Sequence, residues 1–70
     1  MQHQYALAEG AEFKSVRWSD TTGWSNEFRT SMELFQFAAD NGWDFVTVVP
    51  SGKTGTYRQY YFKRDIEGTN

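Results

Sequence analysis

The clearest alternation of side chains near the start of the chain lies between residues 12 and 19. Val16 and Trp18 fall on one side of an extended backbone there, and Phe13 and Arg17 fall on the other. Alternation with aromatic and β-branched members is typical of a β-strand. This segment therefore predicts the first strand of a sheet.

The segments that flank this strand carry weaker patterns. Residues 1–11 mix polar and small side chains, and we expect a partly ordered arm that Tyr5 docks onto the domain. Residues 20–23, Asp-Thr-Thr-Gly, have an acid at the first position and glycine at the fourth, as type I turns favour. Residues 24–28 could then run back along the first strand as a short extra strand.

A helix is predicted next, with recognisable signals at both ends. Thr30 and Glu33 form a capping box, in which the hydroxyl and the carboxylate each accept a hydrogen bond from a backbone N–H group. Ser25 is an earlier alternative start. Residues 41–42, Asn-Gly, tolerate the left-handed backbone that commonly ends a helix.

The predicted helix is apolar around more than half of its circumference. Only Glu33, Gln36 and Asp40 form a polar stripe. At about 100° per residue, the apolar positions are Met32, Leu34, Phe35, Phe37, Ala38 and Ala39. Such a helix is expected to contact a second surface besides its own sheet.

Two further strands are predicted at residues 43–49 and 56–64, with a loop at 50–55 between them and a frayed tail at 65–70. Both strands have apolar side chains on both faces, as in a sheet that is covered on both sides. Strict alternation places Trp43, Phe45 and Val49 on one face and Val46 and Val48 on the other, and it places Tyr57 and Tyr61 opposite Tyr60 and Phe62.

These elements predict an α+β fold of the β-α-β-β type, in a single domain at residues 12–64. We expect a small, mainly antiparallel sheet with one helix packed on one face. The expected order of the strands is first, third, second. A parallel pairing of the first and second strands and a further short strand from Trp24 are the alternatives.

Length and composition leave few ways to stabilise this domain. A chain of 70 residues buries only about 60% of its unfolded surface. With no cysteine and a single histidine, His3, it has no disulfide and no predicted metal site. Three tryptophans, four tyrosines and six phenylalanines are more rings than one small core holds. We therefore predict a homodimer with Leu34, Phe37 and Tyr61 at its interface; singly exposed rings on a monomer are the alternative.

Charge and hydropathy narrow the choice of partners. The net charge of −2 and the pI near 5.2 do not favour a polyanion as the main partner. No apolar run is long enough to span a bilayer, and the start of the chain lacks a basic region followed by an apolar stretch. We expect a cytoplasmic protein without a membrane partner, of host or phage origin.

The sequence does not predict a catalytic centre. Residues 51–54, Ser-Gly-Lys-Thr, resemble the end of a phosphate-binding loop, but Thr47 stands where that motif needs glycine, so a hairpin turn is expected. The serines have only His3, in the arm, as a histidine base, and the acidic residues read as solvated turn and strand positions. We expect no enzyme, no catalytic residue and no cofactor.

Aromatic residues interleaved with basic ones are the most suggestive feature for binding. Bases of nucleotides or of single-stranded nucleic acid stack on aromatic rings beside cationic side chains. The candidate residues for a ligand or partner are Arg17, Trp18, Trp24, Tyr57, Arg58 and Tyr60. The competing interpretation places the rings in the core or an interface and the cations on a solvated rim, and the acidic total favours it.

The chain also resembles a family of very short bacterial and phage proteins that is known only as a domain of unknown function. The resemblance rests on Phe13-Lys14-Ser15-Val16, on the Gly-Trp-acid-hydrophobic-Val strand within residues 41–50, and on Phe62-Lys63-Arg64. It covers residues 12–64, and the aromatic helix and the longer N-terminal arm depart from it. It implies a fold and no activity.

Three functions follow as hypotheses, in order of preference. The first is a small non-catalytic binding or adaptor protein that acts as a homodimer through an aromatic surface. The second is a binder of a small nucleotide-like ligand or of single-stranded nucleic acid through an aromatic and basic surface. An enzyme is the third, since it would need an enclosed pocket with carboxylates.

Overall fold

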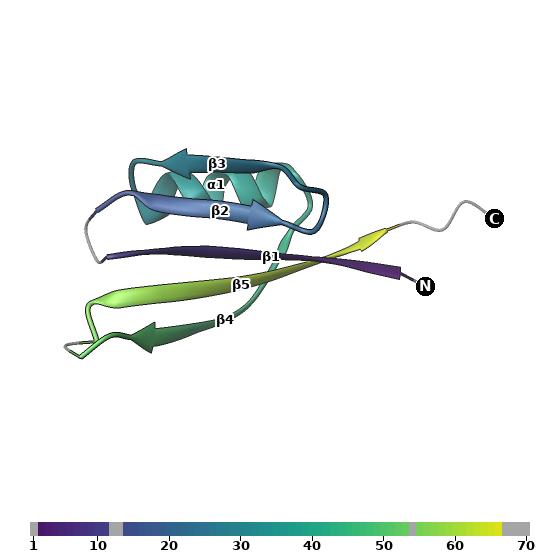
Figure 1. The fold of residues 1–70 in the computed structure, drawn as a ribbon. Coiled ribbons are helices and arrows are strands. Elements are labelled where there is room, and N and C mark those ends of the chain that lie inside the picture. Colours follow the sequence, from purple (N-terminus) through teal and green to yellow (C-terminus); the bar gives the residue numbers. More distant parts are fainter. Residues whose placement is uncertain (1, 12–13, 54, 67–70) are drawn as a thin grey trace.

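The computed structural model of the chain describes residues 2–11, 14–53 and 55–66, with only the backbone described at residues 2 and 66. One sheet has the strand order β3-β2-β1-β5-β4, and every neighbouring pair is antiparallel. In Figure 1 the sheet faces the viewer and the helix lies behind it. The elements are β1 (Gln2–Ala11), β2 (Val16–Asp20), β3 (Ser25–Phe28), α1 (Ser31–Asp40), β4 (Asp44–Ser51) and β5 (Tyr57–Ile66).

The predicted fold class is confirmed, because one helix packs on one face of a small antiparallel sheet. The short extra strand is confirmed as β3, which pairs with β2. The pairing of the last two strands is confirmed as the β4–β5 hairpin. The parallel alternative is wrong, since the described strands pair only in antiparallel fashion.

The segment that was expected to be an arm is the main correction. Residues 2–11 form β1, the central strand, which pairs with β2 on one side and along its whole length with β5 on the other. The domain therefore begins at β1 rather than at residue 12, and β5 extends past residue 64 to Ile66. The strand predicted at residues 12–19 therefore does not pair with the strand predicted at residues 56–64, because β1 lies between β2 and β5. Phe13 and the tail at residues 67–70 lie outside the described residues.

Small side chains explain why β1 occupies the centre of the sheet. Ala6, Ala8 and Gly10 alternate along β1 on the side that faces the helix, and all three are buried. A Cβ atom added at Gly10 would lie 2.3 Å from the carbonyl oxygen of Ser15, which is closer than atoms pack. Glycine at this position therefore lets β2 approach β1 closely.

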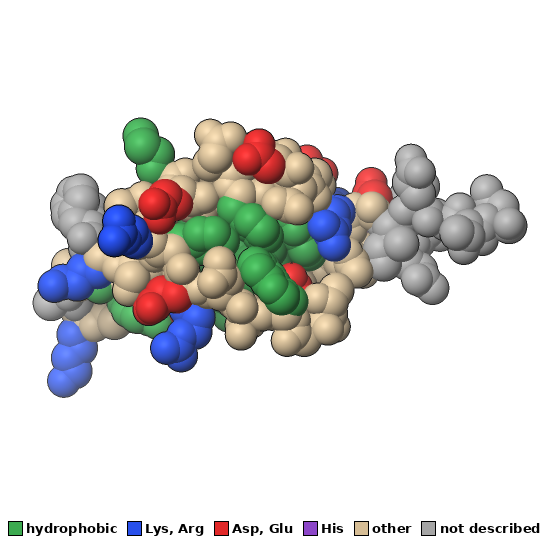
Figure 2. Space-filling view, turned by 90° about the horizontal axis from the view of Figure 1, so that it is seen from above, with side chains coloured by type: hydrophobic (Ala, Val, Ile, Leu, Met, Phe, Trp, Pro, Cys, Tyr) green, Lys and Arg blue, Asp and Glu red, His purple; other side chains and the backbone are tan. Residues whose placement is uncertain are grey.

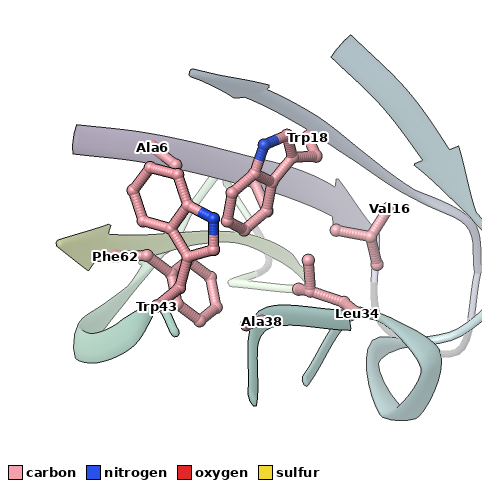
Figure 3. Packing of buried hydrophobic residues seen from close by; sticks show 8 residues of the cluster. Ala6, Val16, Trp18, Leu34, Ala38, Trp43 and Phe62 are labelled. Atoms are coloured by element: carbon pink, nitrogen blue, oxygen red, sulfur yellow. The ribbon is translucent and has the colours of Figure 1, made fainter. Parts of the chain in front are cut away.

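Two indole rings fill the space above these small residues. Trp18 of β2 is fully buried and packs edge-on against Trp43, with ring centroids 5.1 Å apart. Figure 3 shows the two rings between Ala6 and Phe62 of the sheet and the helix. The buried core consists of Ala6, Ala8, Val16, Trp18, Leu34, Ala38, Trp43 and Phe62.

The predicted helix ends are confirmed. The Thr30 hydroxyl accepts a hydrogen bond from the Glu33 N–H at 3.2 Å, and the Glu33 carboxylate accepts one from the Arg29 N–H at 3.0 Å. At the other end Asn41 is the C-cap, and Gly42 follows with φ of +76°. The earlier start at Ser25 is wrong, since that residue begins β3.

A β-bulge changes the alternation that was predicted for β4. Phe45 pairs with Phe62 and Thr47 with Tyr61, so that Val46 is an additional residue in the strand. Val48, opposite Tyr60, therefore shares the helix side with Phe45, while Thr47 and Val49 face the other way. The prediction that Phe45 and Val49 share a face is wrong for this reason.

Substitutions in the helix can test the core directly, because α1 has both a buried and an exposed apolar residue. Leu34→Ala is expected to lower the free energy of unfolding by about 2–5 kcal/mol, since Leu34 is fully buried and its loss leaves a cavity. Met32→Ala, at a position that is 81% exposed, should change it by less than about 0.5 kcal/mol. Urea unfolding at one fixed protein concentration measures both, and equal losses would contradict this core.

Candidate functional site

The side of the sheet opposite the helix, called the open face below, carries most of the exposed apolar side chains. Alternation places the odd-numbered residues of β1 and β5 on this side, because their even-numbered neighbours pack toward the helix. No element of the chain, within the ranges described, lies over this face (Figure 1). Its apolar members are Tyr5, Leu7, Val46, Val49, Tyr57 and Tyr61.

These side chains form a continuous surface rather than isolated spots. Leu7 and Tyr61 are opposite one another on neighbouring strands, and Tyr61 is opposite Thr47 on the next strand. A mostly apolar hollow of about 420 Å³ lies beside them, lined by Tyr5, Val46, Tyr61 and other residues of these strands. A surface of this kind is characteristic of a face that another molecule covers.

The charged groups of the open face have both signs. A second hollow, of about 350 Å³, has Arg17 and Lys14 as well as Glu9 and Glu27 in its wall, together with Tyr57. Glu27 is engaged, since it accepts a hydrogen bond from the Ser15 hydroxyl at 3.2 Å. Because acids balance the cations here, this hollow does not form the basic groove that a nucleic-acid backbone requires.

The predicted ligand residues do not form one site. Trp18 is fully buried in the core, so its assignment to a binding surface is corrected. Arg17 and Tyr57 both line the hollow of the open face. Arg58 and Tyr60 project to the helix side, because they occupy the even-numbered positions of β5. The alternation of the strands thus divides the predicted platform between two faces.

The predicted dimer residues are divided in the same way. Leu34 is a residue of α1 that is fully buried in the core and cannot form an interface, which corrects that assignment. Phe37 is half-buried and packs against Trp18, Trp24 and Phe28, with centroid distances between 5.1 and 5.2 Å. Only Tyr61 lies on the open face.

A second surface, called the seam pocket below, lies where the β2–β3 turn meets the end of the helix. Figure 2 shows hydrophobic side chains along the centre of this side of the molecule, with acidic and basic groups around them. The pocket has a volume of about 260 Å³. Its lining residues are Asp20, Thr22, Trp24, Phe37, Asn41, Trp43 and Arg64.

Two aromatic contacts shape the walls of the seam pocket. Trp24, which is 44% exposed, stacks on Phe37 with ring centroids 5.2 Å apart and planes inclined by 20°. On the other wall, the Arg64 guanidinium lies 4.3 Å from the centre of the Trp43 ring, in a cation–π arrangement. The exposed indole is thus held in place by packing from behind.

Arg64 is fixed by hydrogen bonds from three of its nitrogens. Its Nε and Nη2 atoms both donate to the side-chain oxygen of Gln4, and its Nη1 atom donates to the Asn41 carbonyl oxygen at 3.1 Å. The last bond brings a cation to the C-terminal end of α1, where the helix dipole favours positive charge. Arg64 therefore links β1, β5 and the helix end.

Asp20, which also lines the seam pocket, is fixed by hydrogen bonds as well. Its Oδ1 atom accepts hydrogen bonds from the backbone N–H and the hydroxyl of Thr22, and its Oδ2 atom accepts one from Trp18 Nε1 at 3.0 Å. Partial burial acts to raise the pKa of Asp20, but the bonds from Thr22, Trp18 and the Trp24 backbone outweigh it and hold that pKa below its ordinary value. Asp20 is thus charged at neutral pH.

This lowered pKa predicts a loss of stability in acid. The Asp20 carboxylate contributes stability above its unfolded pKa of about 4, and that contribution is lost as the pH falls through the lower folded value. Between pH 7 and about pH 2.5, Asp20→Asn should therefore lose less unfolding free energy than the unchanged protein. The exposed Asp44→Asn is the matched control, and urea unfolding at several pH values measures all three proteins. An unchanged slope for Asp20→Asn would contradict the assignment.

Sequence reasoning missed the seam pocket as a site. The contact between Trp18 and Asp20 could have been predicted from the sequence, because residues two apart on a strand share a face. The position of Arg64 depends on Gln4, which pairs with it only once residues 2–11 are known to be a strand. Trp43 was read as a strand residue, although it lies between α1 and β4 and is buried.

Within the ranges that the structure covers, no group of three or more His, Cys, Asp or Glu side chains could hold a metal ion. His3 of β1 contacts the carboxylate of Asp65, its partner on β5, at 2.6 Å. The one helix among the described residues, α1, is neither long enough nor apolar enough to cross a membrane.

Comparison with models of protein families, with curated proteins and with solved structures gave no match. The functional interpretation therefore rests on the two surfaces described above.

Proposed function

We propose that this chain is a small non-catalytic binding protein that acts as a homodimer through its open face. The observation that supports this proposal is the one-sided covering of the sheet. One helix packs on one face, while the apolar side chains of β1, β4 and β5 remain exposed on the other. A second copy supplies the missing layer with the same chemistry, as two-fold dimers do.

The small size of the core supports self-association. The core contains eight buried hydrophobic residues, of which three are alanines, and no buried polar group among the described side chains adds to it. A domain of this length is marginally stable unless another element contributes. Burying the open face would stabilise the folded protein by about 25 cal/mol for each Å² of apolar surface that is removed from water.

The edges of the sheet favour a face-to-face dimer over an edge-to-edge one. Strand β3 has only four residues, and β4 carries both a bulge at Val46 and a proline, Pro50. Short edges, bulges and prolines are the devices that prevent strands from pairing with other chains. The open face has no comparable protection at its centre.

The dimensions of the open face are sufficient for a small interface. Five strands spaced about 4.8 Å apart, over a length of about 25 Å, give a flat footprint on the order of 600 Å². The relief of the side chains raises the accessible area above this value. Stable interfaces bury roughly 800 Å² per partner, so the whole face is needed.

The resemblance to short bacterial and phage proteins is retained within this proposal, and with it a cytoplasmic location. The chain has no cysteine, which agrees with a compartment where disulfides do not form. A dimer with two identical outer surfaces could hold a further protein, as an adaptor does.

Tyr61→Lys tests the proposed interface. A lysine at this central position would be buried without a partner, so we expect the dimer dissociation constant to rise by about 30-fold or more. Met32→Lys places the same charge on the helix and is the matched control. Native mass spectrometry over a concentration series measures the masses, and circular dichroism checks that both variants fold.

Two results would contradict the proposal. The first is that the unchanged protein is a monomer at every concentration. The second is that Tyr61→Lys and Met32→Lys raise the dimer dissociation constant equally. In the first case the open face would be free for another protein partner, and in the second the interface would lie elsewhere.

A further inference from the structure

We propose that the seam pocket binds a purine base, which stacks on Trp24 and forms hydrogen bonds with Arg64 and Asp20. This pocket lies on the helix side of the sheet, whereas the proposed dimer uses the opposite face. The two sites can therefore be occupied and tested separately. Each is retained or rejected on its own measurements.

The aromatic wall offers the stacking surface that a base requires. The indole of Trp24 is 44% exposed although it packs on Phe37, which makes one face of the ring or its edge available to a ligand. Phe37 is held in turn by Phe28 and by the buried Trp18. A ring that is fixed from behind loses little entropy when a base stacks on it.

Arg64 has donors to spare on the other side of the pocket. A guanidinium group has five N–H donors, and the three hydrogen bonds to Gln4 and to the Asn41 carbonyl use three of them. The remaining donors belong to a planar group whose orientation is already set. Such a group matches two adjacent acceptors on a flat ligand, as O6 and N7 of guanine are arranged.

Asp20 provides the complementary acceptor. Its two oxygens accept bonds from the N–H and hydroxyl of Thr22 and from Trp18 Nε1, and a carboxylate has about four acceptor positions. Of these three bonds, Oδ2 accepts only the one from Trp18, and a donor on the ligand is expected to bind there, in competition with the nearby backbone N–H of Trp24. The two charged groups line the same pocket without forming an ion pair with each other, so the hydrogen-bonding capacity of each is not used up by the other.

The balance of charge and the size of the pocket identify the part of the ligand that is recognised. One carboxylate and one guanidinium give the walls no net charge, which favours a neutral polar ring over a phosphate group. A volume of about 260 Å³ is below the usual range for drug-sized ligands and suits a single base. Guanine suits these walls better than adenine, because it carries both an adjacent acceptor pair for Arg64 and N–H donors for Asp20.

Nitrogen-resolved NMR of the folded protein tests this inference. Titration with guanosine 5′-monophosphate should shift the indole N–H signal of Trp24 and the amide signals near Asn41 and Arg64 in a saturable way. Adenosine 5′-monophosphate should bind at least about tenfold more weakly, because it lacks the guanine acceptor pair. Ribose 5-phosphate should cause no saturable shift, which separates recognition of the base from recognition of the phosphate.

Trp24→Ala should weaken binding of guanosine 5′-monophosphate by about tenfold, the loss expected for one stacked ring. Met32→Ala removes an exposed apolar side chain from the start of the helix, outside both the seam pocket and the open face, and should leave binding unchanged. The inference is overturned if the unchanged protein shows no saturable shift, if Trp24→Ala binds as tightly as the unchanged protein, or if ribose 5-phosphate gives the same shifts. The mass of each variant is measured alongside, so that a failure of the dimer is recognised independently.

Discussion

The packing of two indoles over the smallest residues of β1 determines the rest of this structure. Trp18 and Trp43 need more room than any other pair in the core, and Ala6 and Ala8 provide it on the central strand. Because alanine contributes little packing of its own, β1 depends on these rings as much as they depend on it. A larger side chain at either alanine would separate the helix from the sheet.

Both candidate surfaces follow from this arrangement. The indoles hold α1 against one face of the sheet, and the described chain has no second helix for the other face, so the tyrosines and valines there remain exposed. The same rings set the walls of the seam pocket. Trp18 donates its N–H to Asp20, while Trp43 supports the guanidinium of Arg64. Trp43 thus belongs both to the core and to the pocket lining, while Trp18 supports the pocket from the core through its hydrogen bond to Asp20.

Much of the fold was predictable, because its signals are local. The capping box at Thr30 and Glu33, the helix end at Asn41 and the hairpin between β4 and β5 are each encoded within a few neighbouring residues. Strand β1 was not predictable in this way. Its alanines, glutamines and glycine have low β-propensity, and they form a strand because they fit beneath distant aromatic rings.

The candidate sites were harder to predict than the fold, for a related reason. The division of the aromatic and basic residues between two faces depends on register, and the bulge at Val46 shifts that register in a way the sequence does not signal. Burial of Trp18 and Leu34 depends on contacts between elements far apart in the chain. Tyr61, predicted at a dimer interface, and Trp24, predicted to bind a ligand or partner, are both exposed, but they lie on different surfaces.

The central claim is that a second copy of the chain covers the open face. Isotope-filtered NOE spectroscopy on equal amounts of labelled and unlabelled protein tests it most directly, because it detects only contacts between copies. Intermolecular contacts are expected from Tyr5, Val49 and Tyr61, and none from Met32 on the opposite side. Contacts that arise from the helix or from the edge of β4 alone, or no intermolecular contacts at concentrations where a dimer mass is measured, would contradict it.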